Sequence, residues 1–298
     1  MDRLQVIIVT YGRRDLVVRC LESLRTAVPE GTQIHVVDNA SPDGTAELVA
    51  ERFPDVRLHR RRHNDGFAVA NNAVLCEVTA PYVLLLNPDT EVPPGVIGYL
   101  LDELGAQPDV GVLGCRLERP DGSFDHAAKR RIPDPAAALR YFALRLAGRQ
   151  TTASTYTAPD VDEHGSGEVD AVNGAFMLVR TAAVREAGLL DERFWMYGED
   201  LDWCLRIKQA GWRVRYDGRV TVVHVKGGSA GTARSLRLNY HFHRSMALFY
   251  RKHLRRKQSV DALVIAGVWL RFCVVGAVDA VTRAVQRLRG RLVAAGAA

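Results

Sequence analysis

Two carboxylates that follow apolar runs are the first candidates for chemistry in this sequence. Asp38 ends the run QIHVVD (33–38), and Asp89 follows YVLLLN (82–87) and Pro88. A buried carboxylate is costly without a partner, although each side chain could simply cap the helix that follows. A carboxylate can accept a hydrogen bond from a base or ribose or bind a hard divalent cation. Such a cation, held by carboxylates and substrate phosphates, is the usual arrangement for diphosphate chemistry.

A second acidic cluster opens the segment GEDLDWCLRIKQAG (198–211), whose spacing predicts a helix that ends at glycine. Glu199, Asp200 and Asp202 fall in its first turn, where acidic side chains complement the helix dipole. The adjacent pair Glu199–Asp200 also offers carboxylates that can take a proton from a hydroxyl group. Asp202 lies two residues further on, so it would point elsewhere on the helix.

Motifs that are absent exclude other chemistry. GxGxxG does not follow the first apolar run, and GxxxxGK[ST] does not occur. A dinucleotide oxidoreductase and a P-loop nucleoside triphosphatase therefore lose their main support. The five cysteines are scattered and form no CxxC pair. A disulfide framework and a cysteine zinc site are thus disfavoured, and a reducing compartment is indicated.

The scaffold that must position these side chains is predicted to alternate strands with helices. Apolar, β-branched runs are typical of buried strands, and amphipathic segments separate them. This alternation predicts a parallel, doubly wound α/β sheet, whose ligands bind beyond the carboxyl ends of the strands. Polar clusters stand at three such ends: Thr10–Tyr11, Asp38–Asn39 and Asn87–Pro88–Asp89. The predicted strands are 4–11, 33–38, 56–60, 82–87 and 110–117, and predicted helices include 66–79 and 93–106.

The second half of the chain is less regular. Residues 119–168 are rich in Pro, Asp, Thr, Ser and Gly, which predicts loops, with one helical piece near 136–148. Strand character returns at 169–180. After the helix at 198–211, two short strands are expected, WRVRYD and RVTVVHV.

Length and charge indicate one α/β domain with an appendage. The chain has 298 residues, 47% of them apolar and 25% charged, which excludes a mostly disordered, a collagen-like or a multi-span membrane protein. The net charge of +6 comes from residues 251–298, which hold ten Lys/Arg and two Asp. The nearly neutral body argues against nucleic-acid binding. The basic tail favours an anionic partner, with a membrane surface as the first candidate.

Six sequence blocks resemble a known family. The blocks are VIIVTYGRRDLVVRCLESL, VVDNASPDGT, NDGFAVANN, LLLNPDT, VNGAFMLVR and ERFWMYGEDLDWCLRIKQAGW. In this order they resemble the motifs of family 2 inverting glycosyltransferases over roughly residues 4–230, and are most similar to the bacterial rhamnosyltransferase-like branch. The resemblance implies the nucleotide-diphospho-sugar transferase (GT-A) fold, a Rossmann-like, mostly parallel sheet, in a domain at 1–230, followed by a helical tail at 231–298.

The resemblance also implies a donor site and a metal site. Tyr11 would lie against the base and Asp38 would hold its edge, while Gly66 would let the backbone approach the ligand. Asp89 and His224 would bind Mg²⁺ or Mn²⁺, although His224 could also be an ordinary strand-end histidine. Because Asn87 replaces the first aspartate of a strict DxD motif, metal binding should be weaker or lean more on the diphosphate. The donor-binding set is Thr10, Tyr11, Asp38, Asn64, Gly66, Asn71 and Asn87.

On the acceptor side, the resemblance places the catalytic base at Asp200. A single displacement at the anomeric carbon needs a carboxylate to take the acceptor proton and a cation to stabilise the leaving diphosphate. We expect residues 119–168 to shape acceptor choice. An aromatic wall at Trp195 and Tyr197 is possible, although such pairs are as often part of a core. The other acceptor-side residues are Asn173, Gly174 and Glu199.

The tail indicates where the acceptor lies. Residues 262–278 are apolar apart from Arg271, and basic residues flank them. This pattern suits a helix lying in the membrane interface, or a helix pair packed on the domain. We expect a cytoplasmic enzyme held at the inner face of the cell membrane, acting on a glycan or a polyprenyl-diphosphate-linked acceptor. A homo-oligomer is left open.

Several alternatives stay open at this point. The donor is expected to be dTDP-rhamnose, with a UDP-hexose as the second candidate, since Tyr11 and Asp38 suit any pyrimidine nucleotide. The QxxRW motif of processive synthases is missing, which favours addition of one sugar. A nucleotidyltransferase is disfavoured because TYGRRD has a single glycine. A non-catalytic nucleotide-sugar-binding protein is disfavoured because Asp89 and Asp200 are both present.

Overall fold

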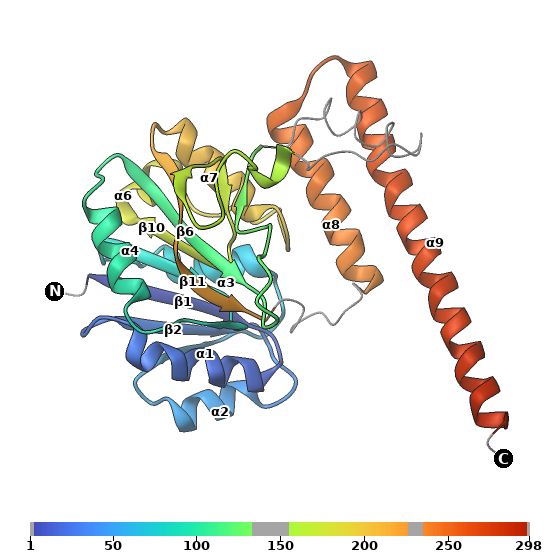
Figure 1. Cartoon of the computed structure of the whole chain (residues 1–298), viewed down its shortest axis with the longest axis horizontal. Coiled ribbons are helices and arrows are strands. Elements are labelled where there is room, and N and C mark those ends of the chain that lie inside the picture. The colour runs from blue at the N-terminus through green and yellow to red at the C-terminus, as the bar shows by residue number, and fades with distance from the viewer. Residues whose placement is uncertain (1–2, 133–154, 226–234, 297–298) are drawn as a thin grey trace. The chain divides into compact units, whose positions relative to one another are not determined.

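The computed structural model describes residues 3–132, 155–225 and 235–296 (Figure 1). They fall into two compact units, which are described separately here. Unit 1 comprises residues 1–195 and 199–232, and unit 2 comprises 196–198 and 233–298. The helical piece expected near 136–148 lies outside the described residues.

Unit 1 is built on a nine-stranded sheet. Its path has the order β3-β2-β1-β4-β10-β6-β11-β5, and β8 pairs with β11. A separate two-stranded sheet pairs β7 with β9. The strands of the large sheet are β1 Leu4–Thr10, β2 Gln33–Asp38, β3 Arg57–Arg60, β4 Tyr82–Leu86, β5 Thr90–Glu91, β6 Val110–Glu118, β8 Ser166–Glu168, β10 Phe176–Arg180 and β11 Arg213–His224, and the small sheet has β7 Lys129–Arg130 and β9 Ala171–Val172.

Six described helices cover the sheet of unit 1. The group α1, α2 and α4 packs on one face, and α3, α6 and α7 pack on the other (Figure 1). The buried side chains of α1 include Leu16, Val17, Cys20, Leu21 and Leu24, which recur at the spacing of an amphipathic helix. The helices are α1 Arg14–Ala27, α2 Thr45–Arg52, α3 Phe67–Leu75, α4 Val96–Gly105, α6 Thr181–Ala187 and α7 Glu199–Gln209.

The parallel register of β1, β2 and β4 brings the polar clusters to one edge. Thr10 pairs with Asp38 across β1 and β2, and Ile8 pairs with Leu86 across β1 and β4. These strands are almost wholly buried, which explains their continuous apolar runs. The residues that follow them therefore leave the sheet together. The α/β class and the mostly parallel core of the sheet are confirmed.

Three details differ from the sequence-based expectation. The strand expected at 169–180 is broken at Asn173–Gly174 into β9 and β10, and β10 runs antiparallel to both β4 and β6, so the sheet is mixed. The two short strands expected at 212–225 form the single strand β11, with an irregular register between Asp217 and Thr221. The helix expected at 66–79 ends at Leu75.

Unit 2 is a helical hairpin. Helix α8 (Leu236–Phe249) passes through a π-helical turn, η2 (Tyr250–Leu254), into the long helix α9 (Gln258–Gly296). The segment 196–198 belongs to the same unit. Ser245 Oγ donates a hydrogen bond to the carbonyl of Met196 at 3.1 Å, and the Tyr197 ring meets Phe242 edge to face at 5.7 Å. Tyr197 is therefore part of the aromatic packing of unit 2.

Candidate active site

Buried oxygen atoms without partners mark the polar edge of the sheet in unit 1. Asp38 is 4% exposed, and its Oδ2 accepts a hydrogen bond from the Ser41 amide at 3.2 Å. Within the described part of the chain, its Oδ1 has no hydrogen-bond partner, and neither has Oδ1 of the buried Asn71. A buried acceptor left without a donor is costly. Both predicted donor-binding residues thus keep an acceptor atom that a bound ligand would satisfy.

The loop that carries Asn64 is held to the end of β2 by Asn39. Asn39 Nδ2 donates to Asn64 Oδ1 at 3.0 Å and to the carbonyl of Gly66 at 3.2 Å. Asn64 Oδ1 also accepts from the amide of Gly66 at 3.1 Å. In contrast, Tyr11 at the end of β1 is 51% exposed, which leaves its ring available for stacking. The buried Thr10 donates to the carbonyl of Gly12 at 3.3 Å.

Gly66, a predicted donor-binding residue, packs against Trp195, a predicted acceptor-side residue. Its φ of +92° favours glycine, and a Cβ built there would lie 2.2 Å from the carbonyl oxygen of Trp195. That carbonyl accepts a hydrogen bond from the Phe67 amide at 2.9 Å, and Trp195 Nε1 donates to the carbonyl of Asn64 at 3.4 Å. The two predicted groups therefore share one packed contact.

The predicted metal ligands Asp89 and His224 lie side by side. The pairing of β5 with β11 sets His224 opposite Thr90, next to Asp89. His224 Nε2 is 3.3 Å from Asp89 Oδ1, and His224 Nδ1 is 3.3 Å from Asp125 Oδ2. Asp125 is fully buried. A histidine held by a carboxylate through its second ring nitrogen is the usual support for a metal-binding histidine.

The electrostatics of this pair fit a divalent cation. Burial lowers the pKa of His224, but its contacts with Asp125 and Asp89 raise the pKa more, to about 9. Two carboxylates thus face one imidazole at a site that attracts positive charge. Among the described residues, no group of three or more His, Cys, Asp or Glu side chains is arranged to hold a metal ion. Asp89 and His224 would therefore need substrate oxygens to complete a coordination shell.

The carboxylate of Asp200, the predicted base, is held by a buried arginine. Arg130 on β7 donates from Nη2 to Asp200 Oδ2 at 2.6 Å and from Nη1 to Oδ1 at 3.3 Å. The amides of Gly174 and Leu201 donate to the same carboxylate at 3.1 and 2.7 Å. Burial lowers the pKa of Arg130, but the charge of Asp200 raises the pKa by more, so the guanidinium keeps its charge. This bidentate geometry fixes the plane of the carboxylate.

Glu199 lies beside Asp200 in a different environment. It is 7% exposed, and its Oε2 has no hydrogen-bond partner among the described residues. Burial raises the pKa of Glu199, and the charge of Asp200 adds to the effect, giving a pKa of about 8. Glu199 is thus pushed toward its protonated form, and a buried carboxyl group with a raised pKa is frequent at sites of proton transfer.

Asn173 and Gly174 link this helix to the end of β4. Asn173 Oδ1 accepts from the Ala175 amide at 2.9 Å, and the carbonyl of Ala175 accepts from the Asn87 amide at 3.0 Å. Gly174 donates to Asp200, as described above. Successive hydrogen bonds therefore connect Asn87, Asn173, Gly174 and Asp200. The local cause is the Asn173–Gly174 break between β9 and β10.

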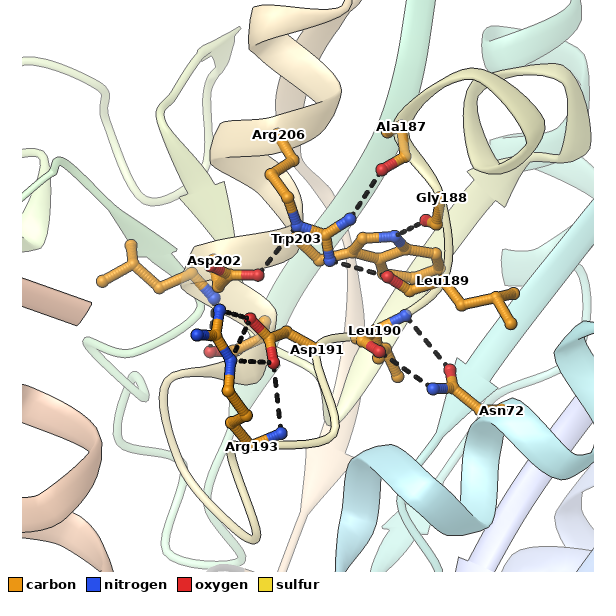
Figure 2. Close-up of polar contacts among 12 residues, drawn as sticks. Asn72, Ala187, Gly188, Leu189, Leu190, Asp191, Arg193, Asp202, Trp203 and Arg206 are labelled. Atoms are coloured by element: carbon orange, nitrogen blue, oxygen red, sulfur yellow. Dashed lines mark hydrogen bonds and ion pairs between the residues drawn. The ribbon is translucent and has the colours of Figure 1, made fainter. Parts of the chain in front are cut away.

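The frame that holds α7 is shown in Figure 2. Asp202 accepts from Arg206 Nε at 2.9 Å, and Arg206 donates to the carbonyls of Ala187 and Leu189 at 2.6 and 2.7 Å. Trp203 Nε1 donates to the carbonyl of Gly188 at 2.8 Å. Asn72 on α3 bonds both the amide and the carbonyl of Leu190. Asp202 is thus structural, as its helical position predicted.

Two residues of this site were missing from the sequence-based set. Arg130 and Asp125 both come from the irregular stretch after β6, where no periodicity marks a buried position. Nothing in SFDHAAKRR (123–131) distinguishes Arg130 from its neighbours Lys129 and Arg131. Arg130 matters because it pairs with Asp200 in the folded chain, and Asp125 matters because it contacts His224. The one signal in the sequence was that charged residues gather in segment 123–131, in the stretch expected to shape acceptor choice.

Comparison with known proteins identifies the family. The sequence profile of glycosyl transferase family 2 matches residues 5–165. N-acetylglucosaminyl-diphospho-decaprenol L-rhamnosyltransferase of Mycobacterium tuberculosis is 30% identical over 259 residues, covering 83% of this chain and 84% of that protein. Rhamnosyltransferase WbbL of Escherichia coli K12 is 23% identical, covering 87% and 97%. The chain therefore belongs to glycosyl transferase family 2, as its motifs predicted.

Solved structures agree on the fold. The mannosyltransferase PcManGT from Pyrobaculum calidifontis, in complex with GDP-Man and Mn²⁺, superposes with a TM-score of 0.56 at 19% identity, covering 95% of this chain and 75% of that one. S. aureus TarS 1-349 in complex with UDP-GlcNAc gives a TM-score of 0.57 at 15% identity, covering 90% and 72%. The predicted GT-A glycosyltransferase fold is confirmed.

The packing at Gly66 predicts a stability effect. Gly66→Ala must adopt a positive φ and displace the carbonyl of Trp195, so we expect a loss of about 3 kcal/mol of unfolding free energy. Gly95 is the matched control, because its φ is +84° and nothing lies within 4 Å of a Cβ built there. Gly95→Ala should lose only about 1 kcal/mol. Urea unfolding of both variants measures the difference, and equal losses would contradict the contact with Trp195.

The environment of Glu199 predicts a pH dependence. Its folded pKa of about 8 lies above the ordinary value of 4.5, so the folded protein binds the proton more tightly than the unfolded chain between these values. The protonated carboxyl group of Glu199 makes its full contribution to the free energy of unfolding below pH 4.5, and this contribution is lost as the pH rises through 8. We expect Glu199→Gln to gain stability relative to wild type over this window, by up to about 1.4 kcal/mol per pH unit. Denaturant unfolding across the pH range checks this, and a pH-independent difference would contradict it.

Proposed function

We propose that this family 2 glycosyltransferase moves rhamnose from dTDP-rhamnose to a glycan or polyprenyl-diphosphate-linked acceptor in the synthesis of cell-envelope polysaccharide. The observation that carries the proposal is the 30% identity with a decaprenol-linked L-rhamnosyltransferase over 83% of the chain. The rhamnosyltransferase WbbL, similar over nearly its full length, adds support. The unsatisfied acceptors of Asp38 and Asn71 suit a nucleotide that donates hydrogen bonds.

We infer an inverting displacement in which Asp200 is the catalytic base. The acceptor hydroxyl oxygen forms a bond to the anomeric carbon while the bond from that carbon to the diphosphate oxygen breaks. The electron pair of the broken bond leaves with the diphosphate, and the hydroxyl proton passes to a carboxylate. Arg130 and the Gly174 amide would act as positioning groups that keep the carboxylate of Asp200 oriented.

Glu199 is the second candidate for the base. All four lone-pair positions of the Asp200 carboxylate receive N–H donors in this structure. The acceptor hydroxyl must therefore displace one of these, and the 3.3 Å contact from Arg130 Nη1 is the longest. Glu199 Oε2 receives no such donor from the residues that the structure describes. Its pKa of about 8, however, favours the protonated form at neutral pH.

We propose that Asp89 and His224 hold a divalent cation, Mg²⁺ or Mn²⁺, together with the diphosphate of the donor. Bound there, the cation would neutralise charge on the leaving diphosphate. Asn87 stands where a strict DxD motif has an aspartate, so the protein supplies one carboxylate fewer than that motif would. Asp125 would fix the ring of His224 so that Nε2 faces the cation, which requires the imidazole to be neutral.

Turnover distinguishes the two candidate bases. We expect Asp200→Asn to reduce kcat by at least about a thousand-fold with donor binding retained, and Glu199→Gln to reduce it less than about ten-fold. Because Asp200→Asn leaves Arg130 buried without its ion pair, circular dichroism and donor titration must first show that the variant folds. Full activity of Asp200→Asn with an inactive Glu199→Gln would move the role of base to Glu199.

The metal proposal is tested by isothermal titration of Mn²⁺ in the presence of dTDP. Asp89→Asn removes a ligand and should weaken Mn²⁺ binding beyond detection. Asp125→Asn should weaken Mn²⁺ binding by about ten-fold or more, because the ring of His224 loses its support. Asp121→Asn, in the same loop but exposed, is the control and should bind as wild type. Unchanged affinity in Asp125→Asn would contradict the role of Asp125.

The donor is tested by titrating a panel of nucleotide sugars with and without Mn²⁺. We expect metal-dependent binding of dTDP-rhamnose, because the related enzymes are rhamnosyltransferases. Binding of UDP-glucose or UDP-galactose instead would make this a UDP-hexose-dependent transferase of the same family. Binding without turnover on any lipid-linked acceptor would favour a non-catalytic nucleotide-sugar-binding protein.

A lipid-linked acceptor implies a place in the cell. We propose that the enzyme is cytoplasmic and works at the inner face of the cell membrane, with the basic C-terminal tail as its point of attachment. The ten Lys/Arg of residues 251–298 support this, because the cytoplasmic leaflet carries anionic lipids. Neither nucleic acid nor a fixed oligomeric state is required by this scheme.

A further inference from the structure

Helix α9 presents apolar side chains to solvent between residues 262 and 280. Gln258–Ala280 has a mean hydropathy of 1.9 in its most apolar window, and 6% of that window is buried. Every exposed side chain or glycine between positions 262 and 280 is apolar. The exposed set, here called the outer face, is Ala262, Leu263, Ala266, Gly267, Leu270, Cys273, Val274, Ala277, Val278 and Ala280.

Two charged residues of α9, Arg271 and Asp261, instead contact α8 and η2. Arg271 Nη1 approaches His243 Nε2 at 3.5 Å, and its guanidinium lies over the Phe242 ring at 5.6 Å. His243 Nδ1 bonds the carbonyl of Asn239, so Nε2 is left as an acceptor for Arg271. Asp261 accepts from the Tyr250 hydroxyl at 2.7 Å. The two charges are thus satisfied inside the hairpin.

Aromatic side chains fix α9 in this orientation. Trp269 packs against Tyr240 of α8 at 5.8 Å between ring centroids, and Phe272 meets Tyr240 at 6.2 Å and His243 at 5.7 Å. These contacts keep Arg271 on the side of α9 that faces α8. A soluble hairpin would place polar residues toward solvent, so the apolar outer face needs a partner.

The ends of the outer face indicate which partner. The turn before α9 contains five Lys/Arg among residues 251–257. An open hollow of about 330 Å³ lies there, lined by Arg251, Arg255, Asp261, Ala262 and Ile265. Arg255 faces Asp261 at 3.7 Å, and both arginine side chains stand next to apolar ones. Guanidinium groups bordering an apolar strip match the boundary between anionic headgroups and acyl chains.

We propose that the outer face of α9 binds the surface of an anionic lipid bilayer, with the helix lying in the interface rather than crossing it. By length and composition alone, α9 could cross a membrane. In unit 2, however, α8 covers one side of α9, and α8 contains Arg237, Asn239, His243 and Arg244. A crossing helix would carry this polar partner into the hydrocarbon core. Only one face of α9 is therefore available to lipid.

This inference deepens the proposed function, because a lipid-linked acceptor gives the face its purpose. Its test is independent of the sugar donor. Cys273 lies on the outer face, Cys76 is exposed in unit 1, and the other three cysteines are buried. The full chain with Cys76→Ser can therefore be labelled at Cys273 with an environment-sensitive nitrobenzoxadiazole dye. The matched control is Cys273→Ser labelled at Cys76.

Vesicles of equal parts phosphatidylcholine and phosphatidylglycerol are then added. We expect a blue shift of the dye at Cys273 and none at Cys76, with stronger quenching by lipids spin-labelled near the headgroup than at the chain end. An unchanged spectrum at Cys273 would overturn the proposal. So would stronger quenching from the chain end, which indicates a crossing helix. A blue shift that grows with protein concentration without vesicles would also overturn it and assign the face to a second copy of the chain.

A second measurement uses flotation with the same vesicles. Leu263→Gln, Leu270→Gln and Val274→Gln combined should weaken vesicle binding by at least about ten-fold, because these exposed side chains supply most of the inserted apolar surface. Leu189→Gln, an exposed leucine of unit 1, should bind as wild type. Equal binding of both would refute the role of the outer face. Neither result would bear on sugar transfer, which is assayed with donor and a soluble acceptor.

Discussion

The buried ion pair between Arg130 and Asp200 is the interaction on which the site depends. Both side chains are largely withdrawn from water, and taking two charges out of water is costly unless geometry and further hydrogen bonds compensate. Here Arg130 also donates to the carbonyl of Val172 at 2.6 Å, and Gly174 completes the shell of Asp200. The pair therefore fixes three things at once: the small β7–β9 sheet, the turn after β9, and the first residues of α7. From that turn, the contact between Ala175 and Asn87 extends the arrangement to the end of β4.

Much of the scaffold could be predicted because it follows from local pattern. The runs at β1, β2 and β4 are apolar and continuous since both faces of the sheet are covered, and parallel pairing then gathers the polar residues that follow them. The resemblance to the family motifs added predicted roles for Asp200, Glu199 and His224. Periodicity could not reveal that β10 runs antiparallel, because strand direction depends on the connections. Residues of the irregular stretch after β6 could not be assigned either, since a carboxylate such as Asp125 gains its role only from the histidine it meets.

The tail shows a different limit of sequence reasoning. Its apolar run and basic flanks predicted a membrane-facing helix, but a helix that is apolar around most of its circumference does not reveal which face is covered. Arg271 appeared as an interruption of the run. In the structure it is an internal contact with α8, so the interruption lies on the covered side. The position of a neighbouring helix, which no single-helix pattern contains, decides this.

The division of the chain between the two units has a consequence for its connectivity. Residues 196–198 belong to unit 2, yet they connect Trp195 to Glu199 by covalent bonds. The backbone thus passes between the units three times, after residues 195, 198 and 232. A chain shortened after residue 232 would leave Met196 and Tyr197 without Ser245 and Phe242, directly before the carboxylates of α7. Residues of unit 2 therefore stand within the sequence of unit 1 as well as after it, so the helical hairpin is more than an appendage that follows unit 1.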